Sequence, residues 1–233
     1  MTIVTDPMTG LAAVKALMAR MTGDEKHTGA ASSTLETLWV LYDRVLRVDP
    51  AWAEDRDRFF LSKGHGPMAY YAVLAAKGFF PLEELDGFGR FRSRLGLHPD
   101  RHLVPGVEIS SGSLGHGLPL AVGTALGLRI RGLTEASVWV LIGDAELDEG
   151  SNHEAIAFAG RAGLERLNVV VIDNASASHG WPGGIEARFT LEGWTAVRTD
   201  GRDPAALEAA FAADRPGQPR VVVAQVEQHL PTH

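Results

Sequence analysis

The chain has 233 residues, and its 22 Lys and Arg against 29 Asp and Glu give a formal net charge of −7. The length suffices for one self-folding α/β domain, while the acidic balance without a basic run argues against a nucleic-acid partner. The absence of Cys excludes disulfides, thiolate zinc sites and a cysteine nucleophile, and with no apolar stretch near 20 residues and no signal-peptide core we expect a cytoplasmic protein without membrane contact.

The first hundred residues are predicted to form helices and loops. The spacing of apolar residues predicts a helix over about residues 11–22. Ser33 and Glu36 have the spacing of a capping box, which predicts that a second helix begins there. A third helix is expected after a Gly-rich loop at 62–66, with Pro67 in its first turn.

The second half alternates between strands and helices. Short apolar runs predict buried strands over 136–142, 168–172 and 220–224, and helices are expected over 151–163 and 203–213. This alternation predicts an α/β fold with a doubly wound, mainly parallel sheet and helices on both faces. With no linker or repeat in the sequence, we expect residues 1–233 to form a single domain.

Two polar residues directly follow two of the predicted strands. Asp144 comes after the first strong strand, and Asn174 comes thirty positions later, after the next one. Because ligands bind at the carboxyl ends of parallel strands, both side chains are expected to point toward one place. Their oxygens suit Mg²⁺ or Ca²⁺. Either residue alone is better explained as a helix cap or a turn, but the pair at this spacing favours a metal site.

A glycine cluster precedes an apolar helix near the middle of the chain. Gly112, Gly115 and Gly117 have the order G-x-x-G-x-G, which matches neither the dinucleotide fingerprint nor a phosphate-binding Walker loop. Such glycines let backbone N–H groups approach a phosphate at a helix N-terminus. Close packing of the helix would explain them equally well.

Several histidines lie in loops of the first half and could bind hydroxyls or phosphate and carry protons near pH 7. They are His27, His65, His98, His102 and His116. Taken singly, each is better explained as a surface or structural residue. His98 and His102 are four residues apart, but Pro99 disfavours the helix that a zinc pair would need.

Together these segments resemble the thiamine-diphosphate-binding, N-terminal part of transketolases. The similarity extends from about Met21 to Ala224 and is greatest to the separate N-terminal subunit of split transketolases. It is carried by residues 61–66, 105–117 and 143–154, the last followed by Asp173-Asn174. The resemblance implies a diphosphate-binding domain of the thiamine-diphosphate-binding fold, without the pyrimidine-binding domain.

The resemblance also implies roles for individual residues. Three positions would hold Mg²⁺ (or Ca²⁺) on the diphosphate: Asp144, Asn174 and the backbone carbonyl of Ser176. A second set would lie along the cofactor: His65, Gly112, Ser113, Leu114, Gly115, Gly143, Asp144 and Ala145, with Asn174. Catalytic positions would be His65 on the diphosphate side, His27 and His98 facing the substrate, and Glu149, which would lie in the interface between subunits and help couple paired sites.

In such enzymes the thiazolium C2 attacks a ketose or ketose phosphate, and a two-carbon ketol unit passes to an aldehyde. The pyrimidine domain contributes the glutamate that activates the cofactor, so the resemblance implies a separate pyrimidine-domain subunit in an α2β2 assembly. Two alternatives remain open. One is a component that decarboxylates 2-oxo acids for acyloin formation or acyl transfer, and the other is a non-catalytic relative that only binds the cofactor.

Four departures from the family pattern motivate these alternatives. Ala145 stands where Gly is usual, which would be strained if the backbone there requires a positive φ. His116 replaces a usual Gln, and the stretch between Gly180 and Gly193 is shorter than usual. The tail from Val226 lacks the Lys- and Gly-containing segment common in the family. These changes predict an unusual substrate or weaker cofactor binding.

Overall fold

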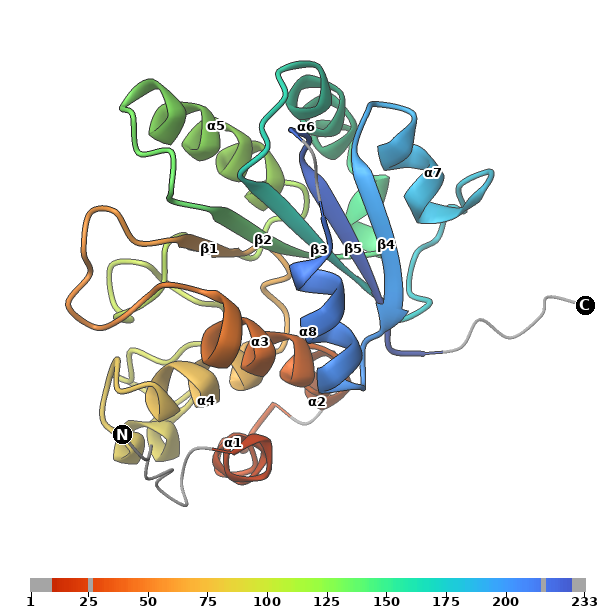
Figure 1. The fold of residues 1–233 in the computed structure, drawn as a ribbon. Helices are drawn as coiled ribbons and strands as arrows, with labels where there is room; N and C mark the ends of the chain where they lie inside the picture. The colour runs from red at the N-terminus through yellow and green to blue at the C-terminus, as the bar shows by residue number, and fades with distance from the viewer. Residues whose placement is uncertain (1–9, 25–26, 215–216, 228–233) are drawn as a thin grey trace, which may run out of the picture.

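A computed structural model describes residues 10–24, 27–214 and 217–227. Five strands form one sheet in the order β1-β2-β3-β5-β4 (Figure 1). The strands are β1 (Arg58–Leu61), β2 (Val138–Gly143), β3 (Leu167–Asp173), β4 (Thr195–Asp200) and β5 (Arg220–Gln225). Every neighbouring pair is parallel, so the predicted parallel sheet is confirmed.

The three predicted strands are the central ones. In β2 and β3 every residue is buried, and in β5 all but the last are, which explains their continuous apolar runs. The two edge strands were not predicted. β1 has only four residues, and the side chains of β4 are partly or fully exposed, so neither gives a distinctive apolar run.

Helices cover both faces of the sheet, as predicted (Figure 1). One face carries α1 (Leu11–Met18), α2 (Thr28–Ser32), α3 (Leu35–Val40), α4 (Met68–Ala76) and α8 (Pro204–Ala212). The other face carries α5 (Gly117–Ile130), α6 (Gly150–Arg161) and α7 (Gly184–Thr190). Because successive side chains of a strand point to opposite faces, Trp139 packs in the first core and Val140 in the second.

The predicted capping box is wrong. The Ser33 hydroxyl donates to the carbonyl of Ala30 over 2.8 Å, so it closes α2 instead of capping the next helix. α3 begins after Thr34, which makes no side-chain cap bond. This helix continues as a π-helical turn, Leu41–Val45, and then ends. Further on, Pro67 immediately precedes α4, one position earlier than predicted.

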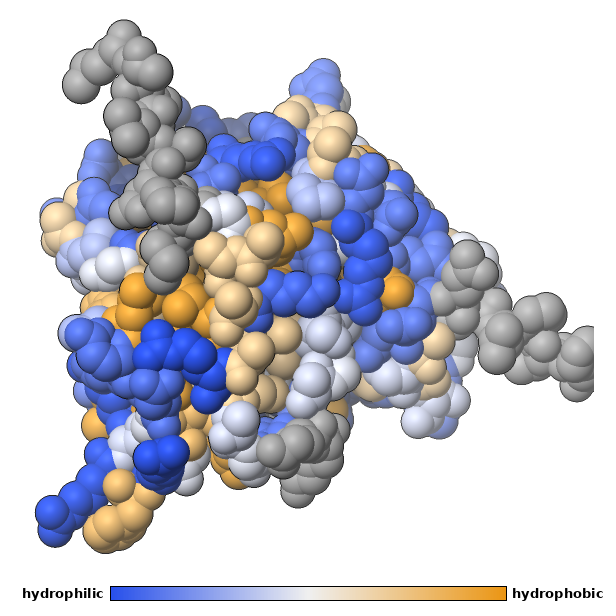
Figure 2. All heavy atoms as spheres, turned by 90° about the horizontal axis from the view of Figure 1, so that it is seen from below, coloured by the Kyte–Doolittle hydropathy of each residue, from blue (hydrophilic) through white to orange (hydrophobic). Residues whose placement is uncertain are grey.

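Two short 3₁₀ helices, η3 (Leu82–Gly87) and η4 (Ala145–Asp148), complete the described elements. Within the described ranges no helix has the length and apolarity needed to cross a membrane. Figure 2 views the molecule from below, on the side of α1 in Figure 1, where apolar residues form an area bordered by polar ones.

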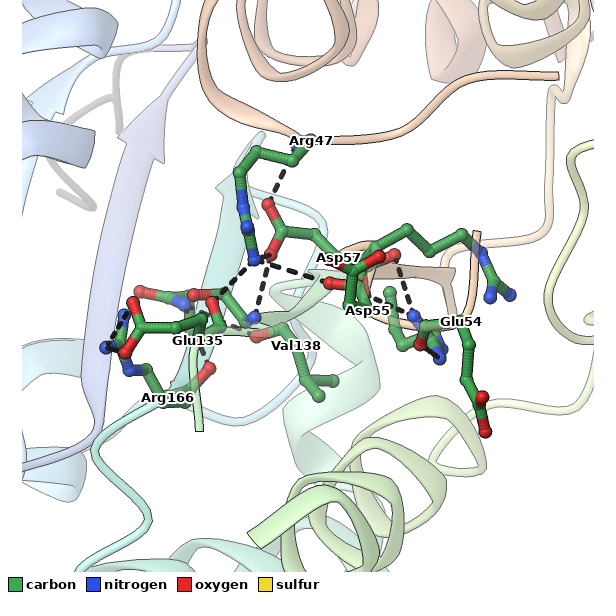
Figure 3. Close-up of polar contacts among 11 residues, drawn as sticks. Arg47, Glu54, Asp55, Asp57, Glu135, Val138 and Arg166 are labelled. Atoms are coloured by element: carbon green, nitrogen blue, oxygen red, sulfur yellow. Dashed lines mark hydrogen bonds and ion pairs between the residues drawn. The ribbon is translucent and has the colours of Figure 1, made fainter. Parts of the chain in front are cut away.

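A polar network fixes the amino ends of β1 and β2 (Figure 3). Asp57 is buried, and its carboxylate accepts the N–H groups of Arg47 and Ser137, each over 2.8 Å. The Arg47 guanidinium donates to the carbonyl of Glu135 over 2.7 Å. The Val138 N–H in turn donates to the carbonyl of Arg166 over 2.8 Å. These bonds join the loop before β1 to both strands, at the end of the sheet opposite the predicted site.

Candidate cofactor site

The predicted metal ligands follow neighbouring strands. Gly143 ends β2 and is paired with Ile172 near the end of β3, so Asp144 and Asn174 leave the same edge of the sheet. This is the topology on which the metal prediction depends, because only adjacent parallel strands bring their carboxyl ends to one place.

Asp144 is 2% exposed and accepts four hydrogen bonds. Its Oδ1 accepts the N–H of Ala145 over 2.8 Å and the hydroxyl of Ser176 over 2.5 Å. Its Oδ2 accepts the N–H groups of Ser176 and Ala177 over 2.7 and 3.2 Å. A positive φ of 57° at Ala175 turns the chain between Asn174 and these donors. The loop after β3 therefore folds back onto the Asp144 carboxylate.

Asn174 supplies the observation that fits a metal ion. Its Oδ1 is buried and has no hydrogen-bond partner. Leaving such an acceptor unsatisfied costs about 1–3 kcal/mol, and a cation would remove that cost. Together with the Asp144 carboxylate, the amide oxygen belongs to the hard-ligand class that Mg²⁺ and Ca²⁺ prefer. The residues present therefore fit a divalent ion of this kind.

Ala145 causes no backbone strain. It begins η4, and among the described residues the non-glycines with positive φ are Trp52, Arg92 and Ala175. The replacement of the usual Gly is therefore accommodated without the penalty that a positive φ would impose.

The glycine loop combines close packing with exposed backbone. A Cβ on Gly115 would lie 2.6 Å from the Ser151 hydroxyl, and a Cβ on Gly117 would lie 2.2 Å from the Ser62 Cβ. Close packing thus explains both of these glycines. Ser113 and Leu114 are exposed, so the tip of the loop is open to a ligand.

Glu146 is a site residue that the sequence reasoning missed. It is 1% exposed, and its carboxylate accepts the Ser62 hydroxyl, the Gly115 N–H over 3.0 Å and the Gly143 N–H over 3.2 Å. Burial raises the pKa of Glu146, while these three bonds and the nearby Lys63 lower it. The available signal was the run of acidic residues between Asp144 and Glu149, but the sequence did not show which of them is buried.

Lys63 was also missed. It is 9% exposed, and its Nζ donates to the carbonyl of Ala30 over 3.4 Å. Its side-chain carbons lie about where they would touch a Cβ on Gly143, at 3.5 Å. Burial lowers the pKa of Lys63, and the charges of Asp144 and Glu146 oppose that shift. A cation therefore lies beside the end of β2.

Three of the five predicted histidines come together. The ring centroids of His27 and His65 are 5.6 Å apart, and those of His65 and His98 are 5.1 Å apart. Burial, followed by the neighbouring His98 and His27, lowers the pKa of His65. The Nδ1 of His27 lies 2.7 Å from Oδ1 of the buried Asp24, another residue that sequence reasoning missed.

The remaining predicted residues are less closely connected. His102 and His116 are exposed, the first beside Asp100 and the second directly before α5. Glu149 is exposed and directly precedes α6, where its Cβ lies close to Gly115. Part of the altered tail, residues 228–233, lies outside the described residues.

A family model described as "Transketolase, thiamine diphosphate binding domain" matches residues 11–227. One of the two components of an apulose-4-phosphate transketolase from Actinobacillus succinogenes is 37% identical over 85% of the chain and 75% of that protein. Transketolase 2 of Xanthobacter flavus is 38% identical over 84% of the chain but only 31% of that protein. The chain thus spans most of a relative that is named as one subunit, and about a third of a longer transketolase.

A protein named Ferredoxin fas2, from Rhodococcoides fascians, is 57% identical over 91% of the chain and 70% of that protein. Iron–sulfur clusters are held by Cys thiolates, and this chain has no Cys, so its own part of the shared region provides no ligands for such a cluster.

Solved structures agree with the family match. A Leishmania mexicana transketolase superposes with a TM-score of 0.76 at 26% identity, covering 93% of this chain and 36% of that one. A Pichia stipitis transketolase in complex with sedoheptulose-7-phosphate gives a TM-score of 0.78 at 25% identity, with 92% and 35% covered. The chain belongs to the transketolase family and comprises its thiamine diphosphate-binding domain.

Proposed function

We propose that this chain is one subunit of a thiamine-diphosphate- and Mg²⁺-dependent transketolase that transfers a two-carbon ketol unit from a ketose to an aldehyde. The observation that carries the proposal is the pair formed by Asp144 and the unpartnered buried oxygen of Asn174 at the carboxyl ends of β2 and β3. With the backbone carbonyl of Ser176, they would hold the metal on the diphosphate.

Other groups compensate the negative charge of the diphosphate. Backbone along the loop from Gly112 to Gly115 and at Gly143 would lie beside it, where N–H groups stabilise an anion. Lys63 adds a buried positive charge beside Gly143. The acidic chain can therefore bind an anion without a basic surface patch.

The three neighbouring histidines would handle the substrate. Asp24 orients His27 through Nδ1, which leaves Nε2 to face a substrate hydroxyl and move its proton. His65 would contact the diphosphate side and His98 the reacting part of the substrate. When bound, thiamine diphosphate supplies the nucleophilic carbon and the electron sink for the two-carbon fragment.

We further propose that a separate chain supplies the pyrimidine-binding domain, in an α2β2 assembly with Glu149 at the interface. Relatives named as subunits, of which the chain covers 75%, support this division. Large exposed apolar side chains also favour a partner, since such surface is usually buried in assemblies. They include Leu114, Leu120, Ile130 and Phe158.

The substrate class follows from two relatives. One is named for apulose-4-phosphate and another, 37% identical, for 6-deoxy-6-sulfo-D-fructose. Both names describe ketoses that carry an anionic group far from the carbonyl, so we propose an anionic ketose as donor. The cytoplasmic location stays a prediction.

A second candidate is decarboxylation of a 2-oxo acid, with the resulting acyl unit passed on or oxidised. The observation that favours it is the name of the 57% identical relative, because a ferredoxin is an electron carrier. The alternative of a non-catalytic relative loses one of its motives, because Ala145 is unstrained.

Reconstitution tests the proposal. The tagged chain is purified from its own cells with any pyrimidine-domain polypeptide that accompanies it, and the complex is assayed with thiamine diphosphate, Mg²⁺ and either ketose phosphates or 2-oxo acids. We expect ketol transfer from an anionic ketose, lost in a matched complex carrying Asp144→Asn. Turnover of 2-oxo acids alone would select the second candidate, and no turnover of either donor would contradict both.

A further inference from the structure

The Glu146 carboxylate joins three segments that are far apart in the sequence. Its Oε1 accepts the hydroxyl of Ser62, from the loop after β1, and the N–H of Gly115, from the glycine loop. Its Oε2 accepts the N–H of Gly143, at the end of β2. These segments are the ones the resemblance assigns to the cofactor, so one side chain contacts all three.

Secondary contacts make this arrangement rigid. The Ser62 hydroxyl, which donates to Glu146, also accepts the N–H of Gly117 over 3.0 Å. The carbonyl of Glu146 accepts the side-chain amide of Asn152 from α6 over 2.5 Å. The first turns of α5 and α6 are therefore tied to the same residue.

Burial makes the arrangement cooperative. Glu146 and Ser62 are each 1% exposed, so water cannot replace a lost donor. A carboxylate in such a place is tolerated only while protein donors satisfy it. Displacing any one segment would leave the carboxylate short of a donor, so the three segments hold one another in place.

The bonds to Glu146 also decide which N–H groups stay available. The N–H groups of Gly115 and Gly143 point to Glu146, and that of Ala145 points to Asp144. Within the described part of the chain, the N–H groups of residues 112–114 donate to no protein acceptor. Glu146 thus holds the base of the glycine loop and leaves the N–H groups at its tip free.

We propose that Glu146 is a positioning residue, which fastens the base of the glycine loop to β2 so that the N–H groups of residues 112–114 face the diphosphate. The inference rests on the proposed function for the identity of the anion. The fastening itself is a property of the chain alone and is measurable without any ligand.

Amide hydrogen exchange, followed by mass spectrometry on the full chain without ligand, tests the fastening. We expect Glu146→Gln to speed exchange at least tenfold in peptides covering 111–117 and 138–144, because its NH₂ group must face one of the N–H donors. Peptides from β5 should exchange as in the wild type. Glu154→Gln, on the exposed side of α6, is the matched control and should change nothing.

Binding of thiamine diphosphate with Mg²⁺, measured by calorimetry on the same proteins, tests the consequence. Glu146→Gln should weaken binding at least tenfold, whereas the Glu154→Gln control should keep the affinity and melting temperature of the wild type. Ser62→Ala is a milder second variant in case Glu146→Gln does not fold. It should loosen the same peptides, and adding Glu146→Gln to it should cost less than Glu146→Gln does alone.

The outcomes separate this inference from the proposed function. Unchanged exchange at 111–117 in both variants, or faster exchange that is equal in β5, would overturn the positioning role. Loosened loops with undiminished binding would overturn its link to the diphosphate. A wild-type chain and complex that bind no thiamine diphosphate would contradict the proposed function, while exchange would still decide the fastening.

Discussion

The Ser176 hydroxyl donates to Asp144 Oδ1 over 2.5 Å, on the carboxylate oxygen that also accepts the Ala145 N–H. With the two bonds to Oδ2, the acceptor positions of this carboxylate are filled by the chain itself. A metal ion must therefore displace one donor. The hydroxyl is the donor that can leave most easily, because Ser176 is exposed and a rotation of its side chain suffices.

We accordingly expect Ser176→Ala to bind Mg²⁺ with thiamine diphosphate more tightly than the wild type, by about threefold to tenfold, since a hydrogen bond to a charged group is worth about 1.5–3 kcal/mol before water competes. The backbone carbonyl of residue 176 is retained. Calorimetry with Mg²⁺ measures the difference. Weaker binding would instead identify the hydroxyl as a metal ligand.

Asp144→Asn should weaken Mg²⁺-dependent cofactor binding by at least about 100-fold, because the carboxylate charge is lost and the new NH₂ group faces N–H donors. The loop 174–178 should also loosen, since it folds onto Asp144. Asp200→Asn, at the end of β4, is the control for removing a charge at this edge of the sheet. Cofactor titrations with and without Mg²⁺ measure the effect, and wild-type affinity in Asp144→Asn would contradict the metal assignment.

Lys63→Met should separate stability from binding. Burial outweighs the attraction of Asp144 and Glu146, since it lowers the pKa of Lys63, so an apolar side chain of similar length should raise the free energy of unfolding by about 1 kcal/mol. Binding of the anionic cofactor should weaken about tenfold. Urea denaturation and calorimetry measure both, with exposed Lys15→Met as control. A destabilised variant would show that the cation is needed for folding.

His65 should stay neutral at pH 7. Its pKa in the folded chain is below the ordinary value of about 6.5, mainly because of burial. Between those two pKa values the unfolded chain binds more protons, so the free energy of unfolding falls as the pH drops below about 6.5 and is unaffected above it. NMR titration of the His65 ring and denaturation at about pH 7.5 and 5.5 test this, with His65→Gln expected to reduce the pH effect. Titration of the ring at or above its ordinary pKa would contradict it.

Two glycines of α5 should respond oppositely to the same substitution. A Cβ on Gly117 would lie 2.2 Å from the Ser62 Cβ, so Gly117→Ala should destabilise the chain by about 3 kcal/mol. A Cβ on Gly123 would meet nothing within 4 Å, so Gly123→Ala should stabilise it by about 1 kcal/mol. Urea denaturation compares them. Equal effects would mean that the contact with Ser62 does not limit this position.

The central sheet could be predicted because its strands carry their own signal. β2, β3 and β5 are buried on both sides, and burial on both sides requires an apolar run. The short β1 and the half-exposed β4 meet no such requirement. The Ser33 capping box failed for a related reason, because a serine hydroxyl satisfies the preceding turn as readily as the following one.

For the site, topology predicted the metal pair and tertiary contact supplied the rest. Asp144 and Asn174 follow adjacent strands, and that adjacency can be inferred from chain order. The roles of Glu146 and Lys63 depend on burial by segments many residues away. Local sequence distinguishes neither from an ordinary surface charge.

The Arg47–Asp57 network at the amino end of the sheet has a practical consequence for engineering (Figure 3). There, buried charge is matched by donors, whereas at the carboxyl end Asn174 Oδ1 and Asp148 Oδ1 have none. The molecule thus keeps its rigidity and its reactivity at opposite ends of the same strands. Substitutions that strengthen the amino end should raise heat tolerance without a loss of turnover, and filling the carboxyl end should exchange one for the other.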